Sequence, residues 1–451
     1  MRSYLMAVFI CLQQLLIAQA VDSINLVGQI VPDSGAIWKP DKTELRLVPY
    51  NDGESVYLST INNDGSFNMK VAVNNPCLYD LKYKGYKVSI LLTPAEPFCK
   101  VIIKTDEKQE VRAMKISGSR ENDAYRIYKR ESLGFKDLMR DIKKECAGDG
   151  SACLAKFKKQ ISAQNELMEY LKMGYKGTYT ANVLANLGEV AELNGNSSAL
   201  SQWQSGFFDA TVFSDTLLYR TPDLNNKISV FLDHVADTSA IGRLHFIQQI
   251  MNKVKGRKEA QKGLLTTLFN NFLDDYRESY IQSLVQWANS QSSLINEQPV
   301  LAAKIKLVAN LLPGMPAPDI TGENLNQQTQ KLSGTTKNNA LTLVIFWESD
   351  CPHCRKAMPG FIRLYKQFHP KGLQVFAVSL DTNKDKWKQF IDTNHLNWTN
   401  IVLPENSSAH ADYFIQYTPT AVLINSKGNI IKRFLNVEEL GPQLAKILGP
   451  E

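Results

Sequence analysis

The chain has 451 residues, of which 44% are hydrophobic and 21% are charged, and its formal net charge is +6. This composition excludes collagen-like, low-complexity and wholly disordered proteins, and the length predicts two to four domains at roughly 100–200 residues each. Lys and Arg are interleaved with Asp and Glu throughout, so we expect no nucleic-acid partner. The cysteines are too few for a disulfide-rich scaffold, but their uneven placement is informative. The seven are Cys11, Cys77, Cys99, Cys146, Cys153, Cys351 and Cys354.

Residues 1–20 have the pattern of a cleaved secretory signal peptide. Arg2 precedes an apolar run that ends in Ala18-Gln19-Ala20, and signal peptidase accepts small residues at these positions. The alternative is a membrane anchor, but the run is shorter than the ~20 residues that span a bilayer. Cys11 would be removed with the signal. No other segment is predicted to span a membrane, so we expect a secreted protein of the periplasm or cell envelope, where disulfides persist.

Residues 21–118 are predicted to form a β-rich N-terminal domain of unknown function. Short runs rich in β-branched and aromatic residues alternate with turn sequences such as Asn63-Asp64-Gly65. Their spacing of roughly ten residues predicts an antiparallel β-sandwich or barrel. The predicted strands are residues 24–30, 44–48, 55–58, 66–73, 87–92 and 100–104.

Residues 119–311 are predicted to form an α-helical domain. Apolar side chains recur there at helical spacing, as in Leu167, Tyr170, Leu171 and Tyr175, while Gly and Pro are sparse. We interpret the aromatic stripes as core; an aromatic ligand groove is the alternative.

Residues 312–451 are predicted to form an α/β domain after a Pro-rich linker at 312–318. Strand and helix patterns alternate and are followed by a hairpin and a closing helix, which indicates a mixed sheet covered by helices on both faces. The predicted strands are 340–347, 373–380, 420–425 and 429–434. The predicted helices are 352–369, 383–395 and 437–448.

The sequence Cys351-Pro352-His353-Cys354 follows a predicted strand and opens a predicted helix. A cysteine at a helix N-terminus is stabilised as a thiolate by the helix dipole and by backbone N–H groups, which lowers its pKa. Pro352 suits the first helical position, and the charge of His353 would tune the thiolate further. Cys354 is close enough to resolve a mixed disulfide formed by Cys351.

Three other kinds of site are alternatives for this motif. A zinc site needs four ligands, and no second Cys or His pair with ligand spacing is nearby, so we expect no metal. A static structural disulfide fits the strand-to-helix position less well than exchange chemistry does. A peroxidase would carry Thr three residues before the reactive cysteine, and Glu348 stands there.

The segment VIFWESDCPHCRKAMPGF, with YTPTAVLINSKGNII downstream, resembles the thioredoxin superfamily. The sequences PAPDI at 316–320 and VSLD at 378–381 resemble its TlpA/ResA branch of envelope thiol–disulfide oxidoreductases. The resemblance covers about 312–451. It implies that Cys351 is the nucleophile, that Cys354 resolves, and that Pro419 is the cis-proline that binds substrate together with Thr418. It also matches Trp347 to the aromatic residue at the strand end, and we expect Trp347 to shape the substrate-docking surface together with Thr418 and Pro419.

Two positions depart from that family. Thioredoxins bury an acidic residue where this chain has Ile345, and ResA-like proteins place a Glu where it has Ala357. Either carboxylate would accept the proton of the resolving thiol, so this chain must deprotonate Cys354 in another way. The His of the CPHC motif is commoner in oxidants of the superfamily, and it favours a higher potential.

The remaining cysteines are candidates for structural disulfides. Cys77 and Cys99 both lie in the predicted β domain, and Cys146 and Cys153 flank a short flexible turn. Four cysteines allow three pairings, and buried thiols are the alternative.

We therefore predict an enzyme, a thiol–disulfide oxidoreductase that exchanges disulfides with protein substrates through Cys351 and Cys354. It would need no cofactor beyond this redox-active pair, and an upstream redox partner in the envelope would restore it. The competing hypothesis is a binding or scaffold protein whose thioredoxin-like domain is a redox-inactive docking module. The sequence indicates neither the direction of exchange nor an oligomeric state.

Overall fold

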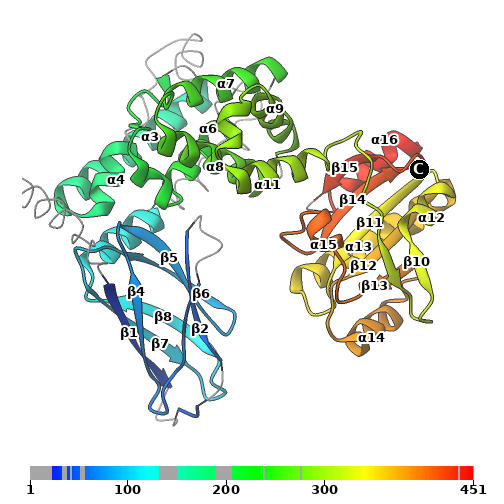
Figure 1. The fold of residues 1–451 in the computed structure, drawn as a ribbon, viewed down its shortest axis with the longest axis horizontal. Coiled ribbons are helices and arrows are strands. Elements are labelled where there is room, and N and C mark those ends of the chain that lie inside the picture. Colours follow the sequence, from blue (N-terminus) through cyan, green and yellow to red (C-terminus); the bar gives the residue numbers. More distant parts are fainter. Residues whose placement is uncertain are drawn as a thin grey trace, which may run out of the picture. The chain divides into compact units, whose positions relative to one another are not determined.

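The structure is a computed structural model that describes residues 23–32, 38–40, 43–50, 56–131, 150–187, 206–234, 236, 239–274, 277–434 and 437–449. The expected signal peptide and Cys146 lie outside these residues, and the side chain of Cys153 is not described. The chain divides into two compact units between Leu268 and Phe269, within helix α8 (Lys258–Asp274) (Figure 1). The division into three domains at 118/119 and 311/312 stays a prediction.

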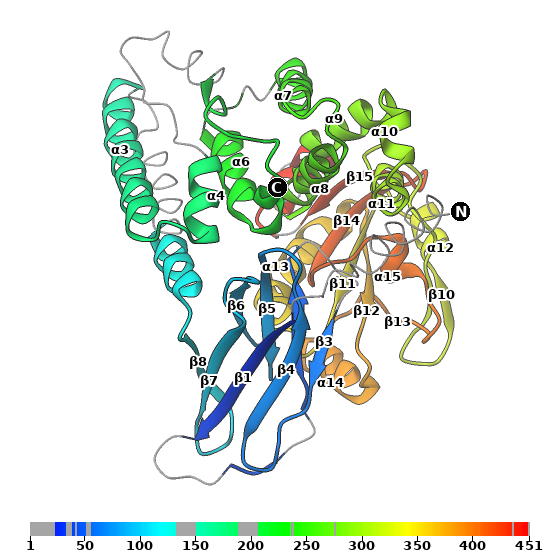
Figure 2. The same cartoon turned by 60° about the vertical axis from the view of Figure 1, so that its left-hand side comes forward.

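The N-terminal strands form two four-stranded sheets (Figure 2). The first has the order β4-β1-β7-β8, with β1 (Ser23–Pro32), β4 (Ser66–Ala72), β7 (Phe98–Thr105) and β8 (Val111–Ser117). The second has the order β3-β2-β5-β6, with β2 (Leu45–Pro49), β3 (Tyr57–Ser59), β5 (Cys77–Tyr83) and β6 (Tyr86–Leu92). β1 pairs with β7 in parallel, so the expectation of a purely antiparallel arrangement is wrong at this pair.

Both sheets contribute side chains to one hydrophobic core. Burial alternates along β4, as a strand with one covered face requires. Leu26 and Val101 of the first sheet and Leu47 and Leu81 of the second are fully buried in the same cluster. Because the two inner faces share this core, each sheet excludes water from the other.

The following segment is helical, as predicted. Its elements are α3 (Gly150–Gly174), α4 (Tyr179–Leu187), η2 (Thr216–Arg220), α6 (Asp223–His234), α7 (Ala240–Asn252) and α8. Phe208 and Phe231 lie at the centre of an aromatic cluster, with ring centroids 5.1 Å apart, which supports the interpretation of aromatic residues as core. Tyr170 of α3 is an exception, because 62% of it is exposed.

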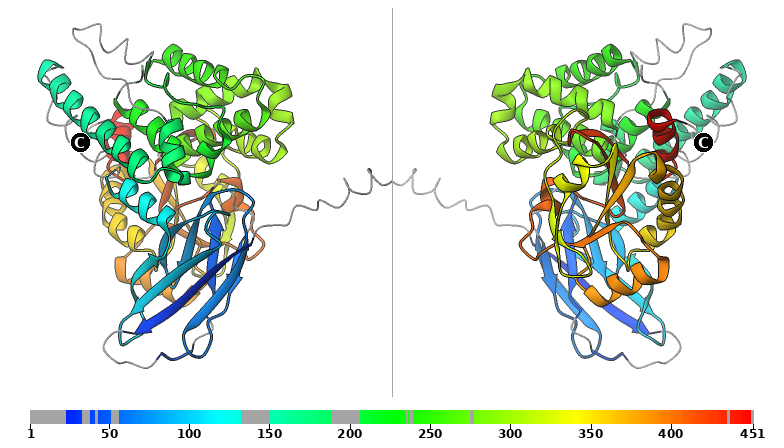
Figure 3. Two further views of the ribbon diagram at one scale, coloured as in Figure 1. Left: turned by 90° about the vertical axis from the view of Figure 1, so that its left-hand side faces the viewer. Right: turned by 90° about the vertical axis from the view of Figure 1, so that its right-hand side faces the viewer.

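The second unit continues with α9 (Glu278–Asn289), α10 (Ser292–Asn296) and α11 (Pro299–Ala309) and then forms a seven-stranded sheet. The strand order is β10-β9-β13-β12-β11-β14-β15. The strands are β9 (Thr321–Glu323), β10 (Thr329–Lys331), β11 (Leu341–Trp347), β12 (Leu373–Ser379), β13 (Thr399–Val402), β14 (Thr420–Asn425) and β15 (Ile430–Phe434), yellow to red in Figure 3. The helices are α12 (Leu332–Lys337), α13 (Pro352–Phe368), α14 (Lys384–Asn394), α15 (Ala409–Asp412) and α16 (Leu440–Leu448).

Helices cover both faces of this sheet, which explains why every residue of β11 is buried. Ile345 and Trp347 pack on the side of α13, α14 and α16, whereas Val344 and Phe346 pack on the side of α15. β11 and β12 are parallel, so their carboxyl ends meet at one edge of the sheet. In open α/β sheets that edge is where ligands and reactive groups gather.

The Pro-rich segment before the sheet is hydrogen-bonded to the β14–β15 hairpin. Gly314 donates its backbone N–H to the carbonyl of Ile430 at 2.8 Å, and Ala317 donates to the carbonyl of Gly428 at 2.9 Å. The hydroxyl of Tyr413 also donates to the carbonyl of Pro318 at 2.6 Å. The predicted linker is therefore an ordered part of the fold. None of the described helices combines the length and the apolar character that crossing a membrane requires.

Candidate active site

The CPHC sequence lies at the turn from β11 into α13. Cys351 is the N-cap of α13, with φ −73° and ψ 118°, and its Sγ accepts a hydrogen bond from the backbone N–H of Cys354 at 3.4 Å. Pro352 begins the helix, where its missing N–H leaves no hydrogen bond unmade. The local sequence thus places one sulfur at the positive end of a helix dipole, as predicted.

Cys351 is half-buried, and its surroundings favour the thiolate. Burial opposes ionisation, but hydrogen bonds from the Thr418 side chain, from Cys354 and from the backbone N–H of His353 outweigh it and lower the pKa of Cys351. When Cys351 is protonated, its Sγ donates to the backbone carbonyl of Thr418 at 3.4 Å, a contact that favours the thiol and that the other hydrogen bonds outweigh. Cys351 is therefore both accessible and acidic enough to act as a nucleophile.

Cys354 has the opposite character. It is 1% exposed, and burial raises its pKa to about 12 against the smaller lowering effect of a backbone hydrogen bond from Glu348. The neighbouring Cys351 thiol adds a further, still smaller rise. Two thiols three residues apart thus differ in both exposure and acidity. Such an asymmetry separates an attacking from a resolving sulfur.

Ser349 anchors the loop that carries Cys351. Its backbone N–H lies 3.0 Å from both carboxylate oxygens of Asp381, and its hydroxyl donates to Asp381 at 2.8 Å. Asp381 also accepts from the hydroxyl of Ser379 at 2.8 Å. From the other side, Nε of Arg355 donates to the carbonyl of Ser349 at 2.7 Å. The carboxyl end of β12 therefore fixes the turn that follows β11.

Sequence reasoning did not identify Ser349 or Asp381 as site residues. The available signal was positional, because Asp381 comes one residue after a predicted strand and Ser349 comes two residues after another. Had the two strands been recognised as parallel neighbours, their ends would have been expected to meet.

The residues expected to bind substrate divide into two groups. Thr418 and Pro419 are half-buried beside Cys351, and the peptide bond between them is cis, as the family resemblance implied. Trp347 is fully buried, with its ring centroid 5.1 Å from that of Phe390. Both sides of β11 are covered at this position, and the contact of Trp347 with substrate stays a prediction. His353 is exposed and reaches Cys351 through its backbone N–H.

The two positions that carry acidic residues in the family lie in apolar surroundings in this chain. Ile345 is fully buried in the core beside Cys354, and Ala357 packs against the same core. The carboxyl of Glu348 has a raised pKa, caused by burial and then by the charge of Asp381. Glu348 lowers the pKa of Cys354 through a backbone hydrogen bond.

Two of the cysteines proposed to form structural disulfides are described in the structure, and both are free thiols. Cys77 and Cys99 are buried thiols on β5 and β7, so the bridge proposed between them is not formed in this structure. Burial raises the pKa of Cys99 to about 12, with a smaller effect of Glu96. Among the described residues, no three His, Cys, Asp or Glu side chains are grouped so that they could hold a metal ion.

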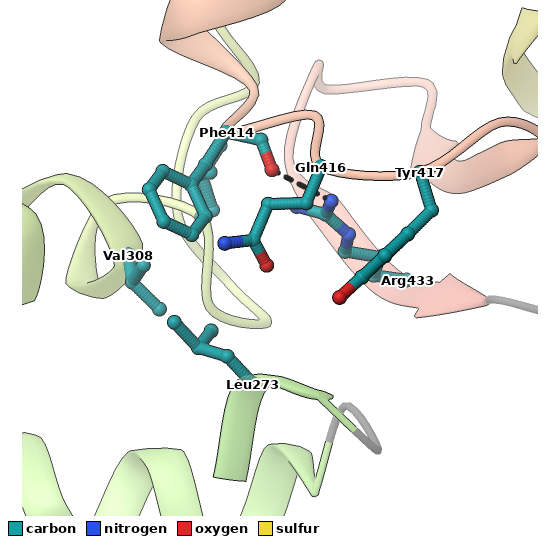
Figure 4. Close-up of a pocket in the computed structure, with 7 residues that line it drawn as sticks. Leu273, Val308, Phe414, Gln416, Tyr417 and Arg433 are labelled. Carbon is teal, nitrogen blue, oxygen red and sulfur yellow. Dashed lines mark hydrogen bonds between the residues drawn. The ribbon is translucent and has the colours of Figure 1, made fainter. Parts of the chain in front are cut away.

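A small pocket lies behind the loop that leads to Thr418 (Figure 4). Its lining includes Leu273, Val308, Phe414, Gln416, Tyr417 and Arg433. Arg433 donates to the backbone carbonyl of Tyr413 at 2.8 Å. It also donates to that of Phe414 at 3.0 Å, the bond dashed in Figure 4. These bonds tie the start of the loop to β15, which helps to place Thr418 next to Cys351.

Comparison with known proteins agrees with this geometry. Residues 313–433 match the AhpC/TSA family. Thioredoxin-like protein YneN of Bacillus subtilis is 30% identical over 120 residues, which are 26% of this chain and 68% of that protein. Thiol-disulfide oxidoreductase ResA of Halalkalibacterium halodurans is 26% identical over 135 residues, 30% of this chain and 72% of that protein.

Among solved structures, the thioredoxin domain of a thiol-disulfide oxidoreductase from Bacteroides vulgatus is 28% identical and covers 31% of this chain and 99% of its own, with a TM-score of 0.29. The family match falls on the sheet and helices that carry Cys351 and Cys354. Through residues 313–433 the chain belongs to the AhpC/TSA family of thioredoxin-like proteins, with the ResA-type thiol–disulfide oxidoreductases among its relatives.

Proposed function

We propose that the protein is a secreted thiol–disulfide oxidoreductase that exchanges disulfides with protein substrates through Cys351 and Cys354. The observation that carries this proposal is the contrast between the two thiols. Cys351 is half-buried with a lowered pKa, whereas Cys354 is buried with a raised one. An exchange enzyme needs this order, because the first thiolate must meet the substrate and the second must wait for the mixed disulfide.

In the reducing direction, the Cys351 thiolate attacks one sulfur of a substrate disulfide. A bond forms between Cys351 and that sulfur, and the other substrate sulfur leaves as a thiolate. Cys354 then attacks Sγ of Cys351, and its proton passes to a departing substrate thiolate. Two electrons have moved from the pair to the substrate, and the second substrate thiolate takes its proton from water, so that the substrate leaves as a dithiol. The oxidising direction is the same sequence reversed.

The substrate is proposed to bind along the loop at Thr418 and Pro419. Pro419 has no N–H, and the backbone beside it can pair with an extended peptide. Tyr417, which is 55% exposed, adds an aromatic surface next to it. After each turnover, a second dithiol protein would return the Cys351–Cys354 pair to its starting redox state. No cofactor other than the pair itself is required.

The place of action is proposed to be the periplasm or cell envelope, on the basis of the signal sequence at residues 1–20. We further propose that the two N-terminal sheets form a β-sandwich, supported by their common core. That module and the helices after it would position substrate or mediate assembly.

The test is reduction of insulin by the purified protein with dithiothreitol as the reductant. Cys351→Ser should abolish turnover, and Cys354→Ser should accumulate a mixed disulfide because the resolving thiol is absent. Cys99→Ala, which removes a thiol from the N-terminal core, is the matched control and should retain activity. Full activity in Cys351→Ser would refute the proposal.

A redox-inactive docking module is the competing function. It predicts an ordinary pKa for Cys351, since nothing would select for a thiolate. The hydrogen bonds that surround Sγ favour the enzyme. The reduction potential of the pair then gives the direction: about −270 mV indicates a reductant and about −120 mV an oxidant.

A further inference from the structure

A groove opens beside the redox pair, between the start of α13 and one side of α14. Its volume is about 430 Å³, which is within the roughly 300–1,000 Å³ range of binding sites for small molecules or single peptide segments. Asp350 and Arg355 line it from the active-site turn, and Lys386, Gln389 and Asn394 line it from α14. Asp350 precedes Cys351 directly, so the groove begins one residue from the nucleophile.

The charged side chains of the groove form an ion-pair network in which Asp350 bridges Lys386 and Arg355. Lys386 Nζ lies 2.6 Å from one carboxylate oxygen of Asp350, and an Arg355 nitrogen lies 3.1 Å from the other. The hydrogen bond and charge of Lys386, with the charge of Arg355, hold the pKa of Asp350 below its ordinary value. Two cations therefore share one anion, which leaves a net positive charge in the groove.

This ion pair can exchange partners at little cost. The side chains of Lys386, Arg355 and Asp350 are 55–57% exposed. Ion pairs at such exposure contribute little to stability, since water competes for each charge. An incoming carboxylate can therefore take one cation from Asp350 without unfolding any element.

The rest of the groove suits a peptide rather than a free ion. Gln389 presents a side-chain amide, which both donates and accepts hydrogen bonds as a peptide backbone does. The Asn394 amide donates to the carbonyl of Phe390 at 2.9 Å, which fixes it along the groove wall. Phe390 lines the same groove and packs on the buried Trp347, so its position is fixed by the core. An aromatic surface with flanking amides and cations matches a short peptide that carries an acidic side chain.

We propose that this groove selects protein substrates with an acidic residue close to the reactive cysteine, and that Lys386 and Arg355 bind its carboxylate. This inference rests on the proposed function and names the substrate class for the same site. The groove lining begins at Asp350, directly before Cys351, so the acidic residue is expected close in sequence to the disulfide cysteine. Asp350 acts as the counter-ion that the substrate displaces.

The experiment uses the full chain and two disulfide-bonded peptides that differ only in having Glu or Lys at the positions flanking one cysteine. We expect turnover of the Glu peptide to exceed that of the Lys peptide at least about fivefold at low ionic strength, and the ratio to fall toward one in high salt. Lys386→Glu should invert the ratio. Lys388→Glu makes the same charge change at an exposed position of α14 outside the groove lining and should leave the ratio unchanged.

Binding is measured separately by fluorescence anisotropy, with labelled peptides that carry Ser in place of both cysteines. This readout needs no redox chemistry. Tighter binding of the Glu peptide, lost in Lys386→Glu and kept in Lys388→Glu, supports the groove even if turnover fails, in which case the proposed function is wrong. Equal binding of the two peptides, or an equal loss in both variants, overturns the groove proposal and leaves the redox function standing.

Discussion

Replacing Asp381 by Asn should loosen the turn that carries Cys351. The carboxylate accepts hydrogen bonds from the N–H of Ser349, the hydroxyl of Ser349 and the hydroxyl of Ser379. Ser349 is 1% exposed and Ser379 is fully buried, so water cannot replace these bonds. Asn has nearly the same shape as Asp, but it has no negative charge. Its NH2 group would face at least one of the Ser349 and Ser379 donors, which then loses its acceptor.

The expected cost follows from the hydrogen bonds that change. A hydrogen bond to a charged group contributes about 1.5–3 kcal/mol, and a buried donor left without an acceptor costs about 1–3 kcal/mol. Asp381→Asn loses one acceptor and weakens the others, so we expect the free energy of unfolding to fall by about 2 kcal/mol. With a urea m-value of about 2 kcal/mol/M, the midpoint of denaturation should shift down by about 1 M.

The assay is urea denaturation of the full chain, followed by tryptophan fluorescence. A second measurement is the rate at which iodoacetamide modifies Cys351 at neutral pH. We expect that rate to fall as well, because the turn no longer holds Sγ against the hydrogen bonds that favour the thiolate. Asp392→Asn, an exposed change on α14, is the control and should shift the midpoint by less than about 0.3 M. If Asp381→Asn behaved like this control in both measurements, the anchoring role would be refuted.

Three further predictions follow from burial and charge. Because the pKa of Cys351 is lowered, its thiolate forms at a lower pH than that of an ordinary cysteine, so iodoacetamide should modify it before Cys354 and with a lower pH midpoint than a cysteine of the unfolded chain; a midpoint equal to or above that of the unfolded chain would contradict the site geometry. Cys99 should resist maleimide in the native protein, since burial raises its pKa, and should react in guanidinium without reductant; a requirement for reductant would show a disulfide. Gly28→Ala should lower stability by about 1–3 kcal/mol in thermal denaturation, because the new Cβ would lie 2.0 Å from the Phe67 ring, whereas Gly174→Ala meets open space and should be neutral within about 0.5 kcal/mol.

The elements that sequence patterns predicted well are those with strong local signals. The apolar run at 340–347 became β11, and the helix expected from Pro352 begins there because Pro352 and the cap at Cys351 define its start. The strand at 420–425 and the helix at 383–395 agree with β14 and α14 within one residue at each end. Local spacing also placed Cys351 and Cys354 correctly relative to the helix.

Features that depend on tertiary pairing were not predictable in this way. The parallel pairing of β1 with β7 joins segments about 70 residues apart, and nothing in either strand specifies the direction of its neighbour. The burial of Trp347 depends on helices that cover both faces of the sheet. The contact of Ser349 with Asp381 and the groove beside Lys386 arise because β11 and β12 end side by side. A strand pattern indicates neither direction nor neighbours.

The hydrogen bonds between the Pro-rich segment and the β14–β15 hairpin protect the rim of the seven-stranded sheet. β15 is an end strand, and the exposed backbone of an end strand invites pairing with a second molecule. The bonds of Gly314 and Ala317 to Ile430 and Gly428 occupy part of that backbone, and two prolines, Pro316 and Pro318, have no N–H to offer to another strand. A fragment that begins after Pro318 would lose this cover, so a thioredoxin-like fragment intended to stay monomeric should begin before Gly314.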